Sequence, residues 1–288
     1  MGSLKTLPVV QPPKATPIFE KIGIVGLGLI GGSIALKSRE LWPTALVIAV
    51  DNKDVLETAM RLHAIDVAAD DLIVLAECDV VILAAPVRQN VAILRELDDN
   101  VRTPAVVTDT GSTKRDIIAA ARSLPPRFTF VGGHPLAGSA RGGLEHARPD
   151  LFQARPWLLT QQSEPLESFI RALGAEPKVV GIDAHDRLLA YLSHLPQMTA
   201  SALMEIVGDA VGEEGLTLAG RGLADTTRLA SSPADIWRDI AATNADELGP
   251  ALDALISLLQ ELRRDLPNGD RLADTFESAA RWRERLKR

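Results

Sequence analysis

Two segments of the chain carry side chains that could move a proton. His134 lies in the segment GGHPLAGS directly after an apolar run, and Ser112 lies in DTGSTK after another such run. A neutral imidazole can accept a proton from a substrate hydroxyl, and a serine can bridge substrate and base. Two alternatives stay open: His134 held by backbone groups in a tight turn, and Ser112 as the cap of a helix starting at Thr113. Lys114 and Arg115 are expected to be solvated residues of that helix's first turn.

A third segment, SHLPQ at residues 193–197, places polar side chains in a region of helical pattern. Pro196 cannot donate a backbone hydrogen bond, so the helix is expected to kink there. A polar, kinked helix face suits the wall of a cleft, with His194 and Gln197 as candidates for substrate contact. His194 is equally compatible with a buried histidine that hydrogen-bonds across the domain. The predicted polar face consists of Asp186, Ala190, Ser193 and Gln197.

Two arginines further along the chain could hold a substrate carboxylate through a bidentate pair of hydrogen bonds. Arg228 lies in TTRLASSP and Arg238 lies in IWRDI, each close to an aspartate. The alternative for either arginine is an ordinary salt bridge, for instance with Asp225 or Asp239. The residue types and spacing do not distinguish Arg228 from Arg238 as the carboxylate ligand.

A glycine-rich loop supplies the element that would place these groups beside a cofactor. The stretch KIGIVGLGLIGG at residues 21–32 is a short β-branched run followed at once by G-x-G-x-x-G. Such a loop turns off a strand, lets backbone approach a pyrophosphate and points a helix N-terminus at the phosphates. Asp51 follows a second predicted strand, where an acid can hydrogen-bond the adenosine ribose and favours NAD over NADP. The predicted cofactor contacts are Gly26, Gly28, Leu29, Ile30, Gly31, Asp51, Ala85, Pro86, Thr110 and Ser112.

Apolar runs and helical patterns alternate as far as residue 183, as a parallel sheet requires, with late strands expected at 157–160 and 178–182. Beyond that point Ala- and Leu-rich helical patterns follow, with amphipathic stretches at 251–263 and 271–286. We therefore expect a Rossmann-type, doubly wound, mostly parallel α/β sheet followed by an all-α domain. The predicted divisions are a flexible N-terminal arm at 1–20, a dinucleotide-binding domain at 21–183 and a helical substrate and dimerisation domain at 184–288.

Composition argues against several classes of protein. The net charge of −7 disfavours a general nucleic-acid surface, so anionic ligands would be held by local basic groups and helix N-termini. No run of about 18 apolar residues occurs, so no membrane span is expected. Cys78 is the only cysteine, which fits a reducing cytoplasm, and it is expected to be a small buried residue. The five histidines lack the spacing of a metal site, and no metal is predicted.

Taken together, the motifs resemble those of the prephenate/arogenate dehydrogenase family of tyrosine biosynthesis. The matching segments occur in the family's order from residue 21 onwards and are GLGLIGGS, DTGSTK, GGHPLAGS, SHLPQ, TTRLASSP and IWRDI. The first of them is widespread by itself, whereas the whole set is highly specific. The resemblance implies NAD-dependent oxidative decarboxylation of prephenate, with arogenate as the alternative substrate, by a homodimer built through the helical domain.

The resemblance also implies roles for individual residues. His134 would interact with the hydroxyl on the substrate ring, with Ser112 assisting. The implied substrate contacts are Arg228, His194, Gln197 and Ser139.

Two positions depart from the family pattern: Gln197 stands where many members have a second histidine, and Ala140 stands where many have an acid. The neutral amide of Gln197 removes a cation that would favour the keto acid of prephenate, so the choice between prephenate and arogenate stays open. A dinucleotide sensor without turnover is an alternative from another class. A hydroxyacid dehydrogenase is disfavoured, because no lysine base lies near His194.

Overall fold

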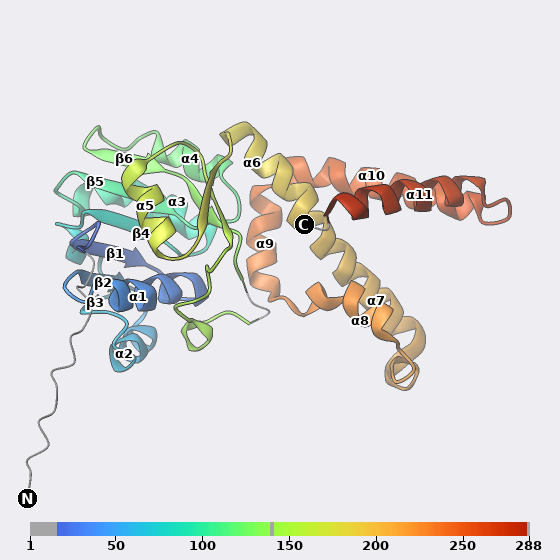
Figure 1. The fold of residues 1–288 in the computed structure, drawn as a ribbon, viewed down its shortest axis with the longest axis horizontal. Coiled ribbons are helices and arrows are strands. Elements are labelled where there is room, and N and C mark those ends of the chain that lie inside the picture. Colours follow the sequence, from blue (N-terminus) through green and yellow to red (C-terminus); the bar gives the residue numbers. More distant parts are fainter. Residues whose placement is uncertain (1–15, 139–140, 287–288) are drawn as a thin grey trace, which may run out of the picture.

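The computed structural model describes residues 16–138 and 141–286. A sheet-bearing part is followed by a group of long helices that extends away from it (Figure 1). Of the predicted N-terminal arm, residues 1–15 lie outside the described residues. Its last residues pack against the sheet-bearing part, where Phe19 is buried and its ring lies 5.6 Å from that of Phe169.

The main sheet has six parallel strands in the order β3-β2-β1-β4-β5-β6, which confirms the predicted Rossmann-type architecture. Strand order reverses between β1 and β4, and ligands of such sheets bind outside the carboxyl ends of the strands at this point. The strands are β1 (Lys21–Val25), β2 (Leu46–Val50), β3 (Val67–Ala69), β4 (Val80–Leu83), β5 (Ala105–Asp109) and β6 (Phe128–Val131). No apolar run in the sequence predicted β3.

Helices cover both faces of this sheet, so its central strands are apolar on both sides. In β4, Val80 and Ile82 join one core cluster, and Val81 and Leu83 join the other.

The predicted burial of Cys78 is confirmed, and burial raises the pKa of its thiol to about 12. The helices of this part are α1 (Leu29–Leu41), α2 (Lys53–Arg61), η1 (Leu72–Leu75), α3 (Val87–Asn100), α4 (Arg115–Ala121), η2 (Leu144–His146) and α5 (Glu164–Ala172).

A second, three-stranded sheet follows, in the order β7-β8-β9. It consists of β7 (Gly133–Pro135), β8 (Pro156–Leu159) and β9 (Glu176–Val179), with β7 antiparallel to β8. The late strands expected at 157–160 and 178–182 are confirmed as β8 and β9 with shifted bounds, but they form this second sheet and do not continue the main one. Because β7 pairs with β8, the segment around His134 is a strand held on the edge of a small sheet, not a free loop.

The rest of the described chain is helical, as predicted. Its first helix passes through a π-helical turn, η3 (Ala190–His194), directly before Pro196, where the sequence predicts a kink. Every helix in the described part of the chain is too short or too polar to span a lipid bilayer. The remaining elements are α6 (Ile182–Leu189), α7 (Leu195–Leu216), α8 (Arg221–Thr226), η4 (Arg228–Ser231), α9 (Ala234–Thr243), α10 (Ala245–Asp265) and α11 (Asp270–Leu286).

Candidate active site

The carboxyl ends of the central strands lie level with one another and gather the predicted cofactor residues at one edge of the sheet. Val25 at the end of β1 pairs with Val50 and Leu83, and Leu83 in turn pairs with Asp109. The loops that follow these strands therefore open toward the same side. They carry Gly26, Gly28, Leu29, Ile30 and Gly31 after β1, Asp51 after β2, Ala85 and Pro86 after β4, and Thr110 and Ser112 after β5.

The glycine loop has the geometry of a dinucleotide cradle. Gly26 has a φ of +92°, a conformation that side-chain-bearing residues rarely adopt. A Cβ on Gly31 would lie 1.9 Å from the carbonyl oxygen of Gly26, so only glycine lets α1 start this close to the turn. In contrast, a Cβ on Gly28 would meet no protein atom within 4 Å, which leaves that face of the loop open. The N-terminus of α1 has no side-chain cap, so its amides are available to phosphates.

Asp51 ties the glycine loop to the end of β2. Its Oδ2 accepts a hydrogen bond from the amide of Leu27 at 2.6 Å, and its Oδ1 accepts one from the amide of Asn52 at 2.6 Å. A carboxylate oxygen has further lone pairs, so these bonds leave Asp51 able to accept hydrogen bonds from a ribose.

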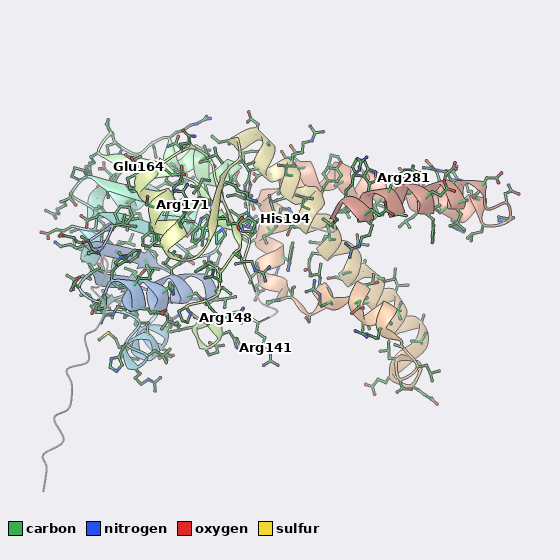
Figure 2. The ribbon with its side chains drawn as sticks, viewed as in Figure 1. Arg141, Arg148, Glu164, Arg171, His194 and Arg281 are labelled. Atoms are coloured by element: carbon green, nitrogen blue, oxygen red, sulfur yellow. The ribbon has the colours of Figure 1, made fainter. Side chains whose placement is uncertain are left out.

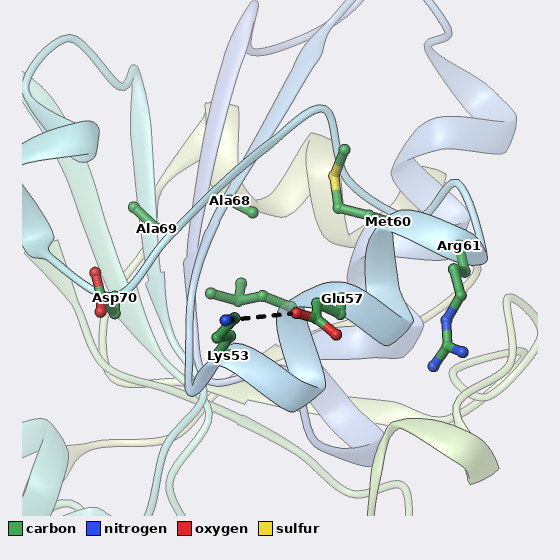
Figure 3. A pocket seen from close by; sticks show the side chains of 8 residues that line it. Lys53, Glu57, Met60, Arg61, Ala68, Ala69 and Asp70 are labelled. Atoms are coloured by element: carbon green, nitrogen blue, oxygen red, sulfur yellow. Dashed lines mark ion pairs between the residues drawn. The ribbon is translucent and has the colours of Figure 1, made fainter.

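A cavity of about 550 Å³ opens beside this edge, between α2 and β3 (Figure 3). Lys53, with its ammonium 3.9 Å from a carboxylate oxygen of Glu57, is one of its lining residues. The others are Leu56, Glu57, Met60, Arg61, Ala68, Ala69 and Asp70. None of the predicted catalytic or substrate-binding residues lines this cavity, so we do not assign the chemistry to it.

His134 is 8% exposed and lies on β7, just beyond the end of β6. Its Nδ1 lies 3.0 Å from Nε2 of His185, a residue of α6. Burial holds the pKa of His134 well below its usual range, and the nearby charge of Lys114 acts in the same direction. The imidazole is therefore neutral at physiological pH, the form that a proton acceptor needs.

The structure joins His134 to two residues of α6, His185 and Asp186. The sequence pattern predicts Asp186 on a polar helical face and predicts no role for His185. Nδ1 of His185 lies 2.7 Å from Oδ1 of Asp186. Burial raises the pKa of Asp186, but hydrogen bonds from His185 and from the amides of Arg115 and Lys114 outweigh it, and the net shift is downward. Asp186 is therefore an ionised carboxylate at the junction of the two parts of the chain.

Lys114 is fully buried, so the prediction of a solvated lysine is wrong. Its ammonium donates to Oδ2 of Asp109 at 2.5 Å and to the carbonyl of Thr113 at 3.0 Å. Oδ1 of Asp109 accepts a hydrogen bond from the amide of Gly133 at 3.1 Å. The buried ion pair thus connects the end of β5 to the strand that carries His134. Arg115, in contrast, is partly exposed and forms an ion pair with Asp246.

Ser112 does not cap α4, which decides one of the alternatives left open. The helix starts at Arg115, and the carboxylate of Asp186 accepts hydrogen bonds from the amides of Lys114 at 2.7 Å and Arg115 at 3.0 Å. The hydroxyl of Ser112 is half-buried and makes no hydrogen bond within the part of the chain that the structure describes. It remains available to a ligand.

His194 is 1% exposed and lies where η3 meets the sheet-bearing part (Figure 2). Its Nδ1 lies 3.0 Å from Nδ2 of Asn244, and its ring meets that of Trp237 edge-on at 6.0 Å. Burial lowers its pKa to about 4, so His194 is neutral. Its Nε2 has no hydrogen-bond partner among residues 16–138 and 141–286. His194 is therefore a buried histidine hydrogen-bonded across the helical part, as one of the two alternatives predicted. Its Nε2 can still bind a ligand.

Gln197 is buried and bonded on both sides of its amide. Its Nε2 donates to the carbonyl of Leu229 at 2.8 Å, and its Oε1 accepts from the hydroxyl of Ser232 at 3.2 Å. These bonds hold η4, the short helix that begins at Arg228. Of the predicted polar face, Asp186, Ala190 and Gln197 are buried and Ser193 is half-buried. The adjacent His194 is buried as well.

The two candidate arginines differ in their surroundings. The side chain of Arg228 is exposed and makes no hydrogen bond or ion pair with any described residue. Arg238 pairs with Asp235 at 3.5 Å, whereas Asp239 is taken by Arg88 at 3.4 Å. The salt bridges suggested for Arg228 are therefore absent among the described residues. Ser139, the remaining predicted contact, and Ala140 lie outside them.

The structure thus brings His134 together with three groups that were not among the predicted catalytic or substrate-binding residues: His185, Asp186 and Lys114. A local signal existed for the first two: an adjacent His-Asp pair opens the first helix after the last strand. No local signal marked Lys114, because a lysine in a helix's first turn is usually solvated.

Comparison with known proteins identifies relatives over most of the chain. The family described as "Prephenate dehydrogenase, nucleotide-binding domain" matches residues 34–183, and "Prephenate dehydrogenase, dimerization domain" matches residues 182–278. The chain is 33% identical to the prephenate dehydrogenase of Bacillus subtilis (strain 168), over 93% of this chain and 76% of that protein. It is 30% identical to the cyclohexadienyl dehydrogenase of Zymomonas mobilis, over 94% of this chain and 97% of that protein.

Solved structures agree with these relatives. The prephenate dehydrogenase of A. aeolicus, crystallised with hydroxyphenyl propionate and NAD+, superposes with a TM-score of 0.83 at 26% identity, covering 93% of this chain and 98% of that one. An arogenate dehydrogenase from Synechocystis gives a TM-score of 0.76 at 28% identity, covering 92% of this chain and 99% of that one. By fold and by sequence, the chain belongs to the prephenate dehydrogenase family.

Proposed function

We propose that the chain is a prephenate dehydrogenase, which catalyses the NAD-dependent oxidative decarboxylation of prephenate to 4-hydroxyphenylpyruvate. The observation that carries the proposal is the buried, neutral His134 on β7, just beyond the carboxyl end of β6 in the main sheet whose β1 leads into the glycine loop. The prephenate dehydrogenases among its relatives support the choice of substrate.

In this proposal His134 accepts the proton of the ring hydroxyl, and Ser112 hydrogen-bonds the same hydroxyl. NAD, when bound, supplies the hydride acceptor. The ring carboxylate leaves as carbon dioxide, and the aromatic product makes the step effectively irreversible. The protein contributes by orienting the substrate against the cofactor and by supplying His134, whose lowered pKa keeps it unprotonated and able to act as a base.

The helical residues provide the remaining substrate contacts in this proposal. Arg228 holds a carboxylate, His194 offers its unused Nε2, and Gln197 sets the position of η4. Ser139 is assigned to the substrate from its motif alone. We assign residues 21–183 to the nucleotide-binding domain and residues 184–288 to the substrate and dimerisation domain.

For the cofactor, we propose NAD over NADP. The open face of Gly28 and the uncapped start of α1 fit a pyrophosphate. Asp51 stands where a ribose 2′-phosphate would meet a like charge. The NAD+ bound to the A. aeolicus prephenate dehydrogenase is consistent with this choice.

A second candidate is arogenate dehydrogenase, alone or with dual specificity. It is favoured by the neutral amide of Gln197, which offers no cation to a keto acid, and by the Zymomonas and Synechocystis relatives. For the whole protein we propose a homodimer in the cytoplasm. The name of the matching dimerization domain and the exposed apolar residues of its helices support the dimer.

The experiment is absorbance at the nicotinamide band with each pairing of prephenate or arogenate with NAD or NADP. Prephenate with NAD should give the fastest NADH formation, and His134→Ala should lower turnover by about 100-fold or more. Much faster turnover of arogenate would transfer the assignment to that substrate. No NADH from either substrate, with NAD still bound, would favour the dinucleotide sensor.

A further inference from the structure

Three buried side chains form a continuous line across the junction between the small sheet and the first helix of the helical part. His134 on β7 contacts His185 on α6 at 3.0 Å, and His185 contacts Asp186 at 2.7 Å. The three are 8%, 1% and 3% exposed, so solvent does not compete for these hydrogen bonds. The proposed reaction uses only the His134 end of this line.

The protons along the line can be assigned from the outer end inwards. The carboxylate of Asp186 accepts hydrogen bonds from the amides of Lys114 and Arg115, which an ionised acid does best. Nδ1 of His185 must therefore carry the proton that it shares with Asp186. In a neutral imidazole the other nitrogen is then an acceptor, so Nε2 of His185 presents a lone pair to His134.

The same logic fixes His134. Its Nδ1 faces a lone pair at 3.0 Å and must donate, which leaves its Nε2 as the basic nitrogen. The opposite tautomer would place two lone pairs against each other in a buried contact, and its Nε2–H could not accept a proton from substrate.

We propose that His185 and Asp186 are positioning residues that hold His134 in the tautomer with a basic Nε2 and stabilise its imidazolium once it has gained the substrate's proton. The inference rests on the proposed function insofar as His134 is the base. An aspartate that orients a catalytic histidine in serine proteases is worth about 10⁴ in kcat, which sets the upper scale of the effect.

Asp186 serves two purposes at once. It caps α4 through the amides of Lys114 and Arg115, so the carboxylate that accepts from His185 also holds the start of the helix that follows Ser112. Among the described residues, the charged or titratable groups that act on His134 are Lys114 at the start of α4, His185 on α6 and His194 on η3. Asp186 lies behind His185, and Asp109 of β5 accepts a hydrogen bond from the amide of the neighbouring Gly133.

The test compares His185→Leu with His185→Gln in the full-length protein. A glutamine amide can donate to Asp186 and accept from His134, whereas leucine can do neither. We expect His185→Leu to lower kcat by about 100-fold across the pH profile, within the range of an orienting group, with KM changed less than about threefold. His185→Gln should recover most of that loss. His146→Leu, a change at a histidine of η2 outside the line, should leave kcat unchanged.

A second measurement does not depend on turnover. Nitrogen-15 NMR of the histidines, with His134→Gln used for assignment, should show His134 protonated on Nδ1 and not on Nε2 at pH 7.5. A proton on Nε2 of His134 in the unmodified protein, or full activity of His185→Leu, would overturn the inference. If instead neither prephenate nor arogenate is turned over while the tautomer is as expected, the proposed function fails and the inference about the tautomer stands.

Discussion

At the scale of single residues, burial determines which charge each candidate carries. Burial keeps the pKa of both His134 and His194 below the ordinary value, so the two histidines are neutral. Arg228 is exposed and has no ion pair within the described ranges, so its charge is available to a ligand. A neutral histidine can accept a proton from a substrate hydroxyl, and the exposed Arg228 can bind a substrate carboxylate.

Arg228→Ala should therefore act mainly on substrate binding. A charge-assisted bidentate pair contributes about 1.5–3 kcal/mol, so the KM for prephenate should rise by roughly 10- to 150-fold while kcat changes little. Steady-state kinetics measures both parameters. Arg238→Ala is the matched control, because that arginine already pairs with Asp235 at 3.5 Å. A rise in KM for Arg238→Ala alone would move the carboxylate contact to Arg238.

At the scale of elements, one glycine of the loop is required by packing within the protein, and another leaves space for a ligand. Gly31 has no room for a methyl group because the Gly26 carbonyl oxygen lies 1.9 Å from the position of its Cβ. Among the described residues Gly28 has room for one, but the methyl group would stand on the face that we propose a pyrophosphate approaches. A side chain is thus excluded at Gly31 by packing inside the protein and at Gly28 by the proposed approach of the ligand.

A pair of alanine variants tests this difference. Gly31→Ala should lower the free energy of unfolding by about 1–3 kcal/mol, as overpacking does, and should also weaken NAD binding. Gly28→Ala should leave stability within about 0.5 kcal/mol of the original while raising the Kd for NAD. Denaturant unfolding and calorimetric titration with NAD measure the two quantities. A large loss of stability in Gly28→Ala would contradict the assignment.

At the scale of the whole molecule, the helical part is open. The α7–α8 pair and the α10–α11 pair extend from the sheet-bearing part in different directions (Figure 1). Large apolar side chains on these helices are exposed in the single chain, including Ile206, Leu259, Phe276 and Trp282. An exposed apolar surface of this extent is typical of a face that another protein surface covers. A second copy of the chain is the partner that we propose.

Sedimentation velocity should accordingly give a mass of twice 30.9 kDa. Phe276→Glu should shift the protein toward monomer, because burying such a side chain contributes about 1.5–3 kcal/mol and a buried charge opposes association. Met60→Glu, at an exposed apolar position on α2, is the control and should leave the mass unchanged. A monomeric unmodified protein at micromolar concentration would contradict the proposed dimer.

The sequence by itself determined the features that depend on neighbours along the chain. The strand–glycine–helix pattern, the order of the main elements, the burial of Cys78 and the disturbance of the helix before Pro196 all follow from local spacing and backbone restriction. The roles of the individual site residues and the division near residue 183 stay predictions.

The tertiary structure alone decided how the site is supported. Lys114 was expected in solvent and is buried against Asp109, and the cap of α4 comes from Asp186, 72 residues away from Lys114. The small sheet, likewise, depends on strands that pair after the main sheet has ended. Spacing along the chain reports which residues are near in sequence, whereas a buried charge is stable only beside partners that folding brings from elsewhere.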